Sequence, residues 1–406
     1  MGDRTATVLR DRATAEGYVA SICFKHGPPR RYGVELEWTV HHADDPTRPL
    51  DMPTLRRALG PHAPATLSSQ PAPGAPAPLC QGSTVTVEPG GQVELSTAPQ
   101  ASVAALLHAA ARDSDQLGDL LDAAGLVRGE QAVDAHRPPT RLLQTPRYTT
   151  MQSVFDRLGP HGSRMMCSTA AVQVCLDVGE PERTSARWAA LHGLGPVMVA
   201  LFANSAAVAD DGQAWESARM RSVLETDPCR SRAAPLVGDP VAGWSARALD
   251  TPLLCVRRAD GCWDAPPGVT FADWIDGALP APPTLEDLEY HLTTLFPPVR
   301  PRGYLEVRYL DAQPGGAWTT PVALLTALMA DEGTVDAVAE ATRPVADLWF
   351  EAARLGLAQP AVAAAAQQVL DLGRDALDAL ALPATVAAQV LADLAHRRAA
   401  LIPTKG

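Results

Sequence analysis

The chain has 406 residues, of which 46% are hydrophobic, and a formal net charge of −12. This composition is typical of a soluble globular protein with one large domain or two moderate ones. The acidic balance argues against a general affinity for nucleic acid or for an anionic membrane, so neither is expected as a partner. The sequence contains no apolar run long enough to span a bilayer.

Residues 1–12 are polar and charged and lack the apolar core of a signal peptide, so a cytoplasmic location is expected. The seven cysteines form an odd count and include no Cys-x-x-Cys pair. That pattern favours reduced thiols over a disulfide framework or a structural zinc site.

The first third of the chain alternates between strand and helix patterns. Residues 31–40 alternate polar and apolar side chains, which predicts a strand. Residues 58–81 are rich in Ala, Pro and Ser, which predicts an exposed, mobile loop without helix inside a domain. Residues 82–88 and 92–98 predict two strands of a hairpin. Leucines at helical spacing predict a helix over 101–124.

The middle of the chain continues the mixture. Residues 171–178 predict a strand, and residues 185–206 predict helix on both sides of a break at Gly195-Pro196. Proline clusters at 280–283 and 297–301 predict further breaks in regular structure.

The last third is mostly helical. Thr284 and Asp287 predict the cap of a helix over 284–295, which is followed by a strand over 304–310. After Trp318, prolines divide an Ala- and Leu-rich tail into about four helices. Strands and helices mixed with a hairpin predict an α+β fold with a largely antiparallel sheet. We expect residues 1–330 to form the core and residues 331–406 to pack on it within the same domain.

Acidic side chains fall on one face of the predicted strands. Alternation in the first strand places Glu35 and Glu37 on the face opposite Val34, Leu36 and Trp38. The same alternation puts a carboxylate on the polar face of every predicted strand, and none carries a lysine there. The full set of glutamates comprises Glu35, Glu37, Glu88, Glu94 and Glu306.

Two interpretations of this polar face remain open from the residues alone. For any single strand, a solvated face is the simpler explanation. For five strands together, glutamates without lysines favour a site for Mg²⁺, which prefers hard oxygen ligands. Arg308, two residues after Glu306, adds a fixed cation that suits a phosphoryl group in transfer. The pattern therefore favours metal-assisted phosphoryl transfer.

Several ordered segments resemble the plant-type glutamate–cysteine ligases, and among them the actinobacterial enzymes of ergothioneine biosynthesis. The glycine-rich hairpin 82–99 is the most specific of these segments. The others cover residues 32–38 (Tyr-Gly-Val-Glu-Leu-Glu-Trp), 166–177, 201–205, 220–222, 226–228 and 303–308 (Gly-Tyr-Leu-Glu-Val-Arg).

The resemblance implies a glutamine-synthetase-like fold, in which an antiparallel sheet forms a funnel with helices on its outer side. It implies ATP-dependent ligation of the γ-carboxylate of L-glutamate to L-cysteine through a γ-glutamyl phosphate. The products would be γ-glutamylcysteine, ADP and phosphate, for ergothioneine biosynthesis. ATP is the implied co-substrate, and two or three Mg²⁺ ions are the implied cofactors. We expect a monomer or a weak homodimer.

The resemblance also implies roles for individual residues. Glu35, Glu37, Glu94 and Glu306 match metal-binding positions, and Glu88 is a fifth expected ligand. Arg308, with Glu306, is the expected catalytic group at the transferred phosphate, and Arg221 is expected to bind the substrate glutamate's α-carboxylate. Tyr148, Met151, Arg164 and Gln173 are the further expected substrate-binding residues. Gln152 replaces an arginine found in plant members. Arg219, Arg230 and Arg232 are interpreted as surface residues.

Two alternatives remain beside this interpretation. One is a carboxylate–amine ligase of the same fold that uses a different amine. The other is a metal- or nucleotide-binding regulator that has lost activity. The phosphate-binding arginine and the metal-binding glutamates occur together in this chain, which argues against the second.

Overall fold

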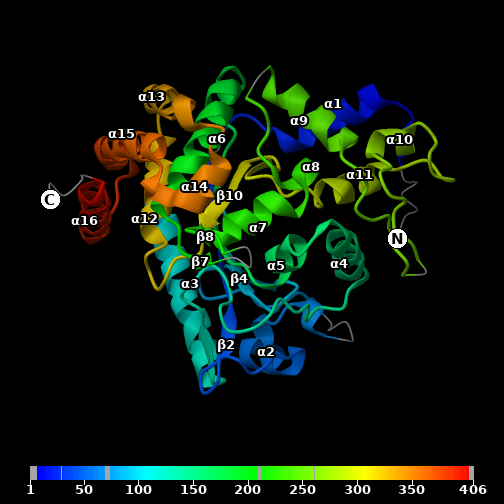
Figure 1. Cartoon of the computed structure of the whole chain (residues 1–406), viewed down its shortest axis with the longest axis horizontal. Coiled ribbons are helices and arrows are strands. Elements are labelled where there is room, and N and C mark those ends of the chain that lie inside the picture. The colour runs from blue at the N-terminus through cyan, green and yellow to red at the C-terminus, as the bar shows by residue number, and fades with distance from the viewer. Residues whose placement is uncertain are drawn as a thin grey trace.

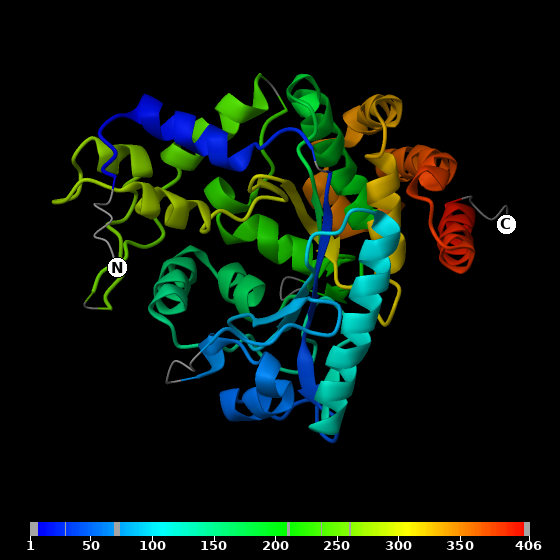
Figure 2. The same cartoon turned by 180° about the vertical axis from the view of Figure 1, so that it is seen from behind.

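A six-stranded antiparallel sheet forms the centre of the molecule (Figures 1 and 2). The computed structural model describes residues 7–28, 30–68, 74–208, 212–236, 238–259 and 261–401. The strand order is β3-β4-β1-β6-β10-β9. The strands are β1 (Tyr32–Trp38), β3 (Thr84–Val87), β4 (Val93–Ser96), β6 (Ala171–Leu176), β9 (Val299–Pro301) and β10 (Leu305–Asp311). The α+β class and the antiparallel sheet are thereby confirmed, as are the five predicted strands.

The apolar face of the sheet carries rows of cross-strand neighbours. Leu36 pairs with Leu95 on one side and with Val172 on the other, and all three side chains are buried. Such aliphatic pairs are the main source of stability within a sheet. Helices α3 (Val103–Ala123), α6 (Thr184–Leu201) and α12 (Thr319–Leu328) pack against the strands. Figure 2 shows α3 and α12 together on one side of the strands.

The opposite, polar face is covered by other helices. These are α4 (Pro146–Leu158), α5 (His161–Cys167) and α7 (Ala218–Thr226), whose side chains line a cavity shared with the sheet. α4 begins at Pro146 because the Thr145 side chain accepts a hydrogen bond from the Tyr148 N–H, and α7 is capped in the same way by Ser217. The two faces of one sheet therefore serve the core and the cavity separately.

The predicted break at Gly195-Pro196 is wrong, because α6 runs through both residues. The reason for the glycine lies in packing. A Cβ on Gly195 would lie 1.8 Å from the ring of Trp349, and one on Gly193 would lie 2.3 Å from Thr342. These glycines allow close approach of α13 (Glu332–Thr342) and α14 (Trp349–Leu355) to α6.

The predicted mobile loop over 58–81 is too long and wrongly excludes helix. Helix α2 (Met52–Leu59) extends into it, and two 3₁₀ turns follow at Gly60–His62 and Ala65–Leu67. The side chains of Leu67 and Leu79 are buried, so both ends of the segment pack on the core. Residues 69–73 lie outside the described residues.

Up to Leu401, where the described residues end, the C-terminal tail has five α-helices where about four are predicted. After α12, α13 and α14 come α15 (Pro360–Ala376) and α16 (Ala384–Ala400). The additional break separates α12 from α13 and contains no proline. The chain starts a new helix there because the Asp331 side chain caps α13 by accepting a hydrogen bond from the Thr334 N–H. Buried residues of the tail and of the sheet belong to one hydrophobic cluster. The division at residue 330 stays a prediction.

The other elements are short. The predicted capping box on α11 (Leu285–Leu292) is confirmed. The remaining helices are α1 (Arg12–Cys23), α8 (Pro228–Ser231), α9 (Pro240–Asp250) and α10 (Phe271–Ile275). Two small strand pairs join β2 (Val40–His42) to β5 (Leu126–Arg128) and β7 (Ala207–Val208) to β8 (Ala214–Trp215). Within the described ranges, every helix is too short or too polar to cross a bilayer.

Candidate active site

Four of the predicted glutamates occupy neighbouring positions on the polar face. Glu37 on β1 lies directly opposite Glu94 on β4, and Glu35 lies opposite Gln173 on β6. Glu306 on β10 pairs across the sheet with Cys175. Ligand atoms of Glu35, Cys175 and Glu306 all lie within 4.8 Å of one another. The predicted alternation therefore brings the carboxylates together, as the sequence suggests.

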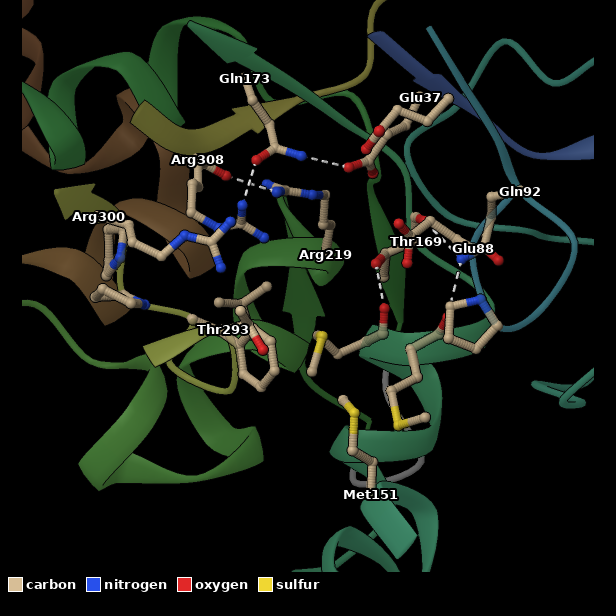
Figure 3. Close-up of a pocket in the computed structure, with 18 of the residues that line it drawn as sticks. Glu37, Glu88, Gln92, Met151, Thr169, Gln173, Arg219, Thr293, Arg300 and Arg308 are labelled. Atoms are coloured by element: carbon tan, nitrogen blue, oxygen red, sulfur yellow. Dashed lines mark hydrogen bonds between the residues drawn. The ribbon is translucent and has the colours of Figure 1, made fainter. Parts of the chain in front are cut away.

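A cavity of about 300 Å³ lies over this face. The sheet and the hairpin turn supply its polar side, which includes Glu37, Glu88 and Glu94. Figure 3 shows Met151 on the opposite side of the cavity from Glu37, Gln173 and Arg308. The remaining lining residues are Pro89, Gln92, Arg147, Tyr148, Met165, Met166, Thr169, Arg219, Met220, Val223, Thr293, Phe296, Pro297, Pro298, Arg300 and Arg302.

A chain of hydrogen bonds connects the predicted catalytic arginine to a predicted metal ligand (Figure 3). The Arg308 guanidinium donates to the side-chain oxygen of Gln173. The Gln173 amide donates to Glu37 Oε1 at 2.6 Å, and the Ala171 N–H donates to Glu37 Oε2 at 2.9 Å. Both oxygens of Glu37 thus have fixed partners before any ligand binds.

Glu306 is fully buried and surrounded by arginines. It pairs with Arg300 Nε at 2.7 Å, Arg308 Nη1 at 2.8 Å and Arg302 Nη1 at 3.4 Å. Burial by itself raises the pKa of Glu306, but the charges of Arg300 and Arg308 outweigh it and hold the pKa well below its usual range. Glu306 is therefore a permanent anion that orients the arginines.

The other glutamates have the opposite electrostatic environment. Burial and then the charges of Glu94 and Glu306 raise the pKa of Glu35 to about 7. Burial, and then the negative charge of Glu88, raises the pKa of Glu37 to about 7. Burial, and then the negative charge of Glu94, raises the pKa of Glu88 to about 7. The pKa of Glu94 is raised for the same reasons. A cluster of carboxylates that repel one another favours a bound cation.

The donor set fits magnesium. The carboxylates of Glu37, Glu88 and Glu94 line the central cavity, and those of Glu35 and Glu306 group with the thiol of Cys175. Carboxylate oxygens are the ligands that Mg²⁺ takes in proteins. The thiol of Cys175 is the soft group among them, and burial raises its pKa well above the usual value. Glu35, Glu37, Glu88 and Glu94 are the residues with raised pKa that would hold such ions.

The predicted substrate-binding residues separate into two groups. Tyr148, Met151 and Gln173 line the central cavity. Arg164 and Arg221 instead line a neighbouring pocket of about 230 Å³, which meets the central cavity at the shared residue Thr169.

Arg221 is held firmly in that neighbouring pocket. Its Nε lies 3.0 Å from Glu225 Oε2, and its guanidinium lies 4.7 Å from the centre of the Trp215 ring. His161 Nε2 contacts the same Glu225 oxygen at 2.7 Å. The guanidinium is therefore oriented from two sides.

A third cavity, of about 360 Å³, adjoins the other end of the polar face. Glu35 and Cys175 lie at its edge beside Tyr304, and Lys25 and Arg31 supply positive charge. The polar face thus borders two of these three hollows, and the remaining pocket shares Thr169 with the central cavity.

Sequence reasoning missed several residues of the central cavity. Arg219, interpreted as a surface residue, is buried, donates to the Arg308 carbonyl oxygen and lies 3.6 Å from Asp311. Arg300 belongs to β9. This strand was not predicted, because the prolines around it indicate a break in regular structure. Proline is tolerated on an edge strand such as β9. The prolines around Arg300 therefore did not exclude a strand, and an edge strand could have been predicted there.

Comparisons with known proteins show the family of the chain. A family model described as "Glutamate-cysteine ligase family 2(GCS2)" matches residues 31–395. The chain is 38% identical over 373 residues to the glutamate–cysteine ligase EgtA of Mycobacterium tuberculosis strain H37Rv, covering 89% of this chain and 83% of that protein. It is 31% identical to the chloroplastic glutamate–cysteine ligase of Medicago truncatula, covering 73% of this chain and 61% of that protein.

A solved structure shares the fold. It is the glutamate–cysteine ligase of Francisella tularensis in complex with AMP, with a TM-score of 0.53 at 12% identity, covering 93% of this chain and 82% of that chain. The family model and the curated relatives define the class of this protein as a ligase. The chain belongs to the glutamate–cysteine ligase family 2.

Proposed function

We propose that this protein joins the γ-carboxylate of L-glutamate to the amine of L-cysteine at the expense of ATP. One observation carries the proposal: partly buried carboxylates whose pKa values are raised by burial and by one another share a cavity with Arg308, a cation held in place by Glu306. Carboxylates of this kind favour divalent cations, and an arginine beside them suits a phosphoryl group in transfer. Similarity to EgtA supports glutamate and cysteine as the substrates.

The three hollows suggest where glutamate and ATP bind. Arg221 and Arg164 would bind the α-carboxylate of glutamate, which places its γ-carboxylate past Thr169 in the central cavity. The phosphates of ATP would lie over the glutamates of the sheet. The nucleoside would then occupy the third cavity, where Lys25 and Tyr304 lie.

Two or three Mg²⁺ ions are the proposed cofactors, held by Glu35, Glu37, Glu88 and Glu94 with Glu306 close by. When bound, they would neutralise the phosphates and the mutually repelling carboxylates. The protein's part is to hold these oxygens in place before binding. The Gln173 amide and the Ala171 N–H do so for Glu37.

The proposed reaction has two steps. An oxygen of the γ-carboxylate attacks the γ-phosphorus of ATP, and ADP leaves as γ-glutamyl phosphate forms. The cysteine amine then attacks the acyl carbon and loses a proton as the carbon–oxygen bond to phosphate breaks. Arg308, held by Glu306 and Gln173, would stabilise the charge on the transferred group in both steps. Arg219 and Arg300 add positive charge from the same side of the cavity.

An assay of ADP release tests the proposal. With glutamate, Mg²⁺ and ATP present, release should depend on cysteine, and γ-glutamylcysteine should accumulate in equal amount. Similar turnover with unrelated amines would favour a ligase for a different amine. Absence of turnover with every amine would favour a regulator that binds nucleotide.

We further propose that the product enters ergothioneine biosynthesis. The support is the sequence identity of 38% and 37% to EgtA of two mycobacterial species. Deletion of the gene from the producing organism should abolish ergothioneine, and supplied γ-glutamylcysteine should restore it. Normal ergothioneine in the deletion strain would remove the pathway assignment and leave the ligase proposal intact.

A further inference from the structure

A further cavity, of about 240 Å³, shares no lining residue with the three hollows described above. We call it the arginine pocket, because Arg30, Arg183 and Arg187 line it. Its other lining residues come from the segment that follows β6 and from the chain around the start of α13. Figure 1 shows α13 beside α6, the helix that carries Arg187. The pocket therefore lies beside the first turns of both helices.

Arg187 forms no ion pair with any described residue. Its guanidinium donates to two neutral acceptors, the carbonyl oxygens of Met329 and Asp177, each at 3.1 Å. Its Nε is buried without a hydrogen-bond acceptor among the described residues. Burial lowers the pKa of Arg187, the charge of Asp177 opposes this effect, and the charge of Arg30 adds to it. A partly buried cation of this kind is unfavourable by itself and favours a bound anion.

The other two arginines differ in how far they are neutralised. The Arg30 side chain is exposed and makes neither a hydrogen bond nor an ion pair within the described part of the chain. Arg183 instead pairs with Asp336 at 2.5 Å, and its Nε lies 3.8 Å from Glu332 Oε2. Arg30 and Arg187 are therefore the two cations of the pocket that remain available to a ligand.

The start of α6 adds to the positive charge. Arg183 occupies the N-cap position, and its side chain makes no capping hydrogen bond. A helix carries partial positive charge at its N-terminus, where a further cation is unfavourable. α13 differs, because Asp331 caps it by accepting hydrogen bonds from Thr334. Of the other acidic lining residues, Glu332 lies beside Arg183 and Glu180 is exposed, so the inner side of the pocket is positive.

We propose that the arginine pocket binds a small molecule through an oxyanion, a phosphate or a carboxylate group, held between Arg30 and Arg187. Guanidinium groups match both oxyanions, because their N–H donors lie in one plane and can bind two oxygens at once. The two hydrogen bonds of Arg187 to backbone oxygens leave it further N–H donors for a ligand. The proposed ligation uses none of these arginines, so the site goes beyond that function.

The pocket also has an apolar part, because Ala330 and Val335 line it. These two side chains suit a short hydrocarbon group next to the oxyanion. Inorganic phosphate and acetate are therefore the smallest suitable probes. Phosphate tests the first oxyanion alone, and acetate tests the second together with one methyl group.

Isothermal titration calorimetry measures the Kd of each probe at constant ionic strength, with a chelator and without nucleotide. Arg30→Ala should raise the Kd of the probe that binds more tightly by about tenfold or more, the scale of a lost hydrogen bond to a charged group. This variant should stay folded, because Arg30 is exposed. Arg187→Gln should raise the same Kd, because the amide removes the charge. Binding at the catalytic cavities is common to every protein compared, so the difference between proteins reports on the arginine pocket.

Arg56→Ala is the matched control. Arg56 lies on α2, is exposed like Arg30 and forms no ion pair with a described residue. Its removal changes the net charge equally and should leave the Kd of both probes unchanged. ADP release by Arg30→Ala should match the native rate, since the arginine pocket shares no lining residue with the central cavity.

Binding of phosphate alone that depends on Arg30 would assign a phosphate site, and the same dependence for acetate alone would assign a carboxylate site. Equal Kd values for both probes in the native protein, Arg30→Ala and Arg187→Gln would overturn the inference. A loss of turnover in Arg30→Ala would overturn it too, because the pocket would then belong to the catalytic site. The titrations need no turnover, so failure of the proposed ligase function is a separate result.

Discussion

Gln173 joins Arg308 to Glu37: its side-chain oxygen accepts from the arginine, and its amide donates to Glu37 Oε1 at 2.6 Å. The amide side chain carries both the donor and the acceptor that these two contacts need, whereas an ionised carboxylate lacks the donor and an ammonium lacks the acceptor. The proposed phosphate-binding cation and a proposed metal ligand are thus oriented by one side chain from the strand between them. Gln173 is therefore a positioning residue in the proposed mechanism.

Gln173→Ala should lower kcat by about 10–100-fold, the usual cost of removing a group that orients a metal ligand. The apparent affinity for Mg²⁺ should fall as well, because Glu37 loses one of its two fixed partners. Steady-state ADP release over a range of Mg²⁺ concentrations measures both quantities. Gln144→Ala, at an exposed position, should change neither. An unaltered dependence on Mg²⁺ would show that Gln173 does not position the metal ligand.

Arg308→Ala and Glu37→Ala should each reduce turnover by at least about 10²-fold, the scale seen when a group that stabilises transition-state charge is removed. Far-ultraviolet circular dichroism should report a folded protein in both cases. Arg343→Ala is a suitable control, because Arg343 forms an exposed pair with Glu340 that is remote from catalysis. Near-native turnover in either cavity variant would refute the assigned site.

Much of the polar face was predictable because strand periodicity is strict. Residues two apart on a strand face the same side, so Glu35 and Glu37 had to lie together once residues 31–40 formed a strand. The structure adds the register, which sets Glu37 opposite Glu94. A sequence pattern gives faces within a strand, whereas register depends on contacts between strands.

The choice between Arg219 and Arg221 was not predictable from spacing. Side chains two residues apart on a helix are separated by a rotation of about 200° about the helix axis. Only one of the two arginines can therefore face a given cavity. The structure places Arg219 in the central cavity and Arg221 in the neighbouring pocket. Which side of α7 faces the sheet is decided by tertiary packing, as is the convergence of α4 and α5.

Removing the buried anion Glu306 should destabilise the fold. In Glu306→Gln, three arginines lose their common carboxylate, and breaking a buried ion pair from one side costs about 3–5 kcal/mol. Urea unfolding followed by tryptophan fluorescence measures the loss. Glu340→Gln is the control, because Glu340 is the exposed partner of Arg343. Its free energy of unfolding should stay within about 0.5 kcal/mol of the native value. A similarly small loss at Glu306 would mean that the arginines do not depend on it.

Stability of the metal-free protein should fall as pH rises from about 4.5 to about 7. Glu35, Glu37 and Glu88 have folded-state pKa values of about 7 against 4.5 for the model carboxyl, so the folded state holds more protons than the unfolded state in this window. Mg²⁺ binds the ionised carboxylates and should reverse the loss. The rise in Tm on adding Mg²⁺ should therefore be larger at about pH 8 than at about pH 5.5.

Calorimetry with and without Mg²⁺ at the two pH values measures this difference. Ca²⁺ at the same concentration serves as a comparison ion, and a chelator should return Tm to the metal-free value. Equal effects of Mg²⁺ at both pH values would contradict a cation site made of these glutamates.

Gly195→Ala should destabilise the protein although alanine is the better helix former. The added Cβ would lie 1.8 Å from the Trp349 ring, and the strain of such overpacking costs about 1–3 kcal/mol or more. Gly243→Ala is the matched control, since Gly243 lies inside α9 with no atom within 4 Å of a Cβ. There, higher helix propensity should stabilise the fold by about 1 kcal/mol. Opposite signs in urea unfolding would establish that the glycine of α6 is required for close packing of α14, while a gain at both positions would contradict that contact.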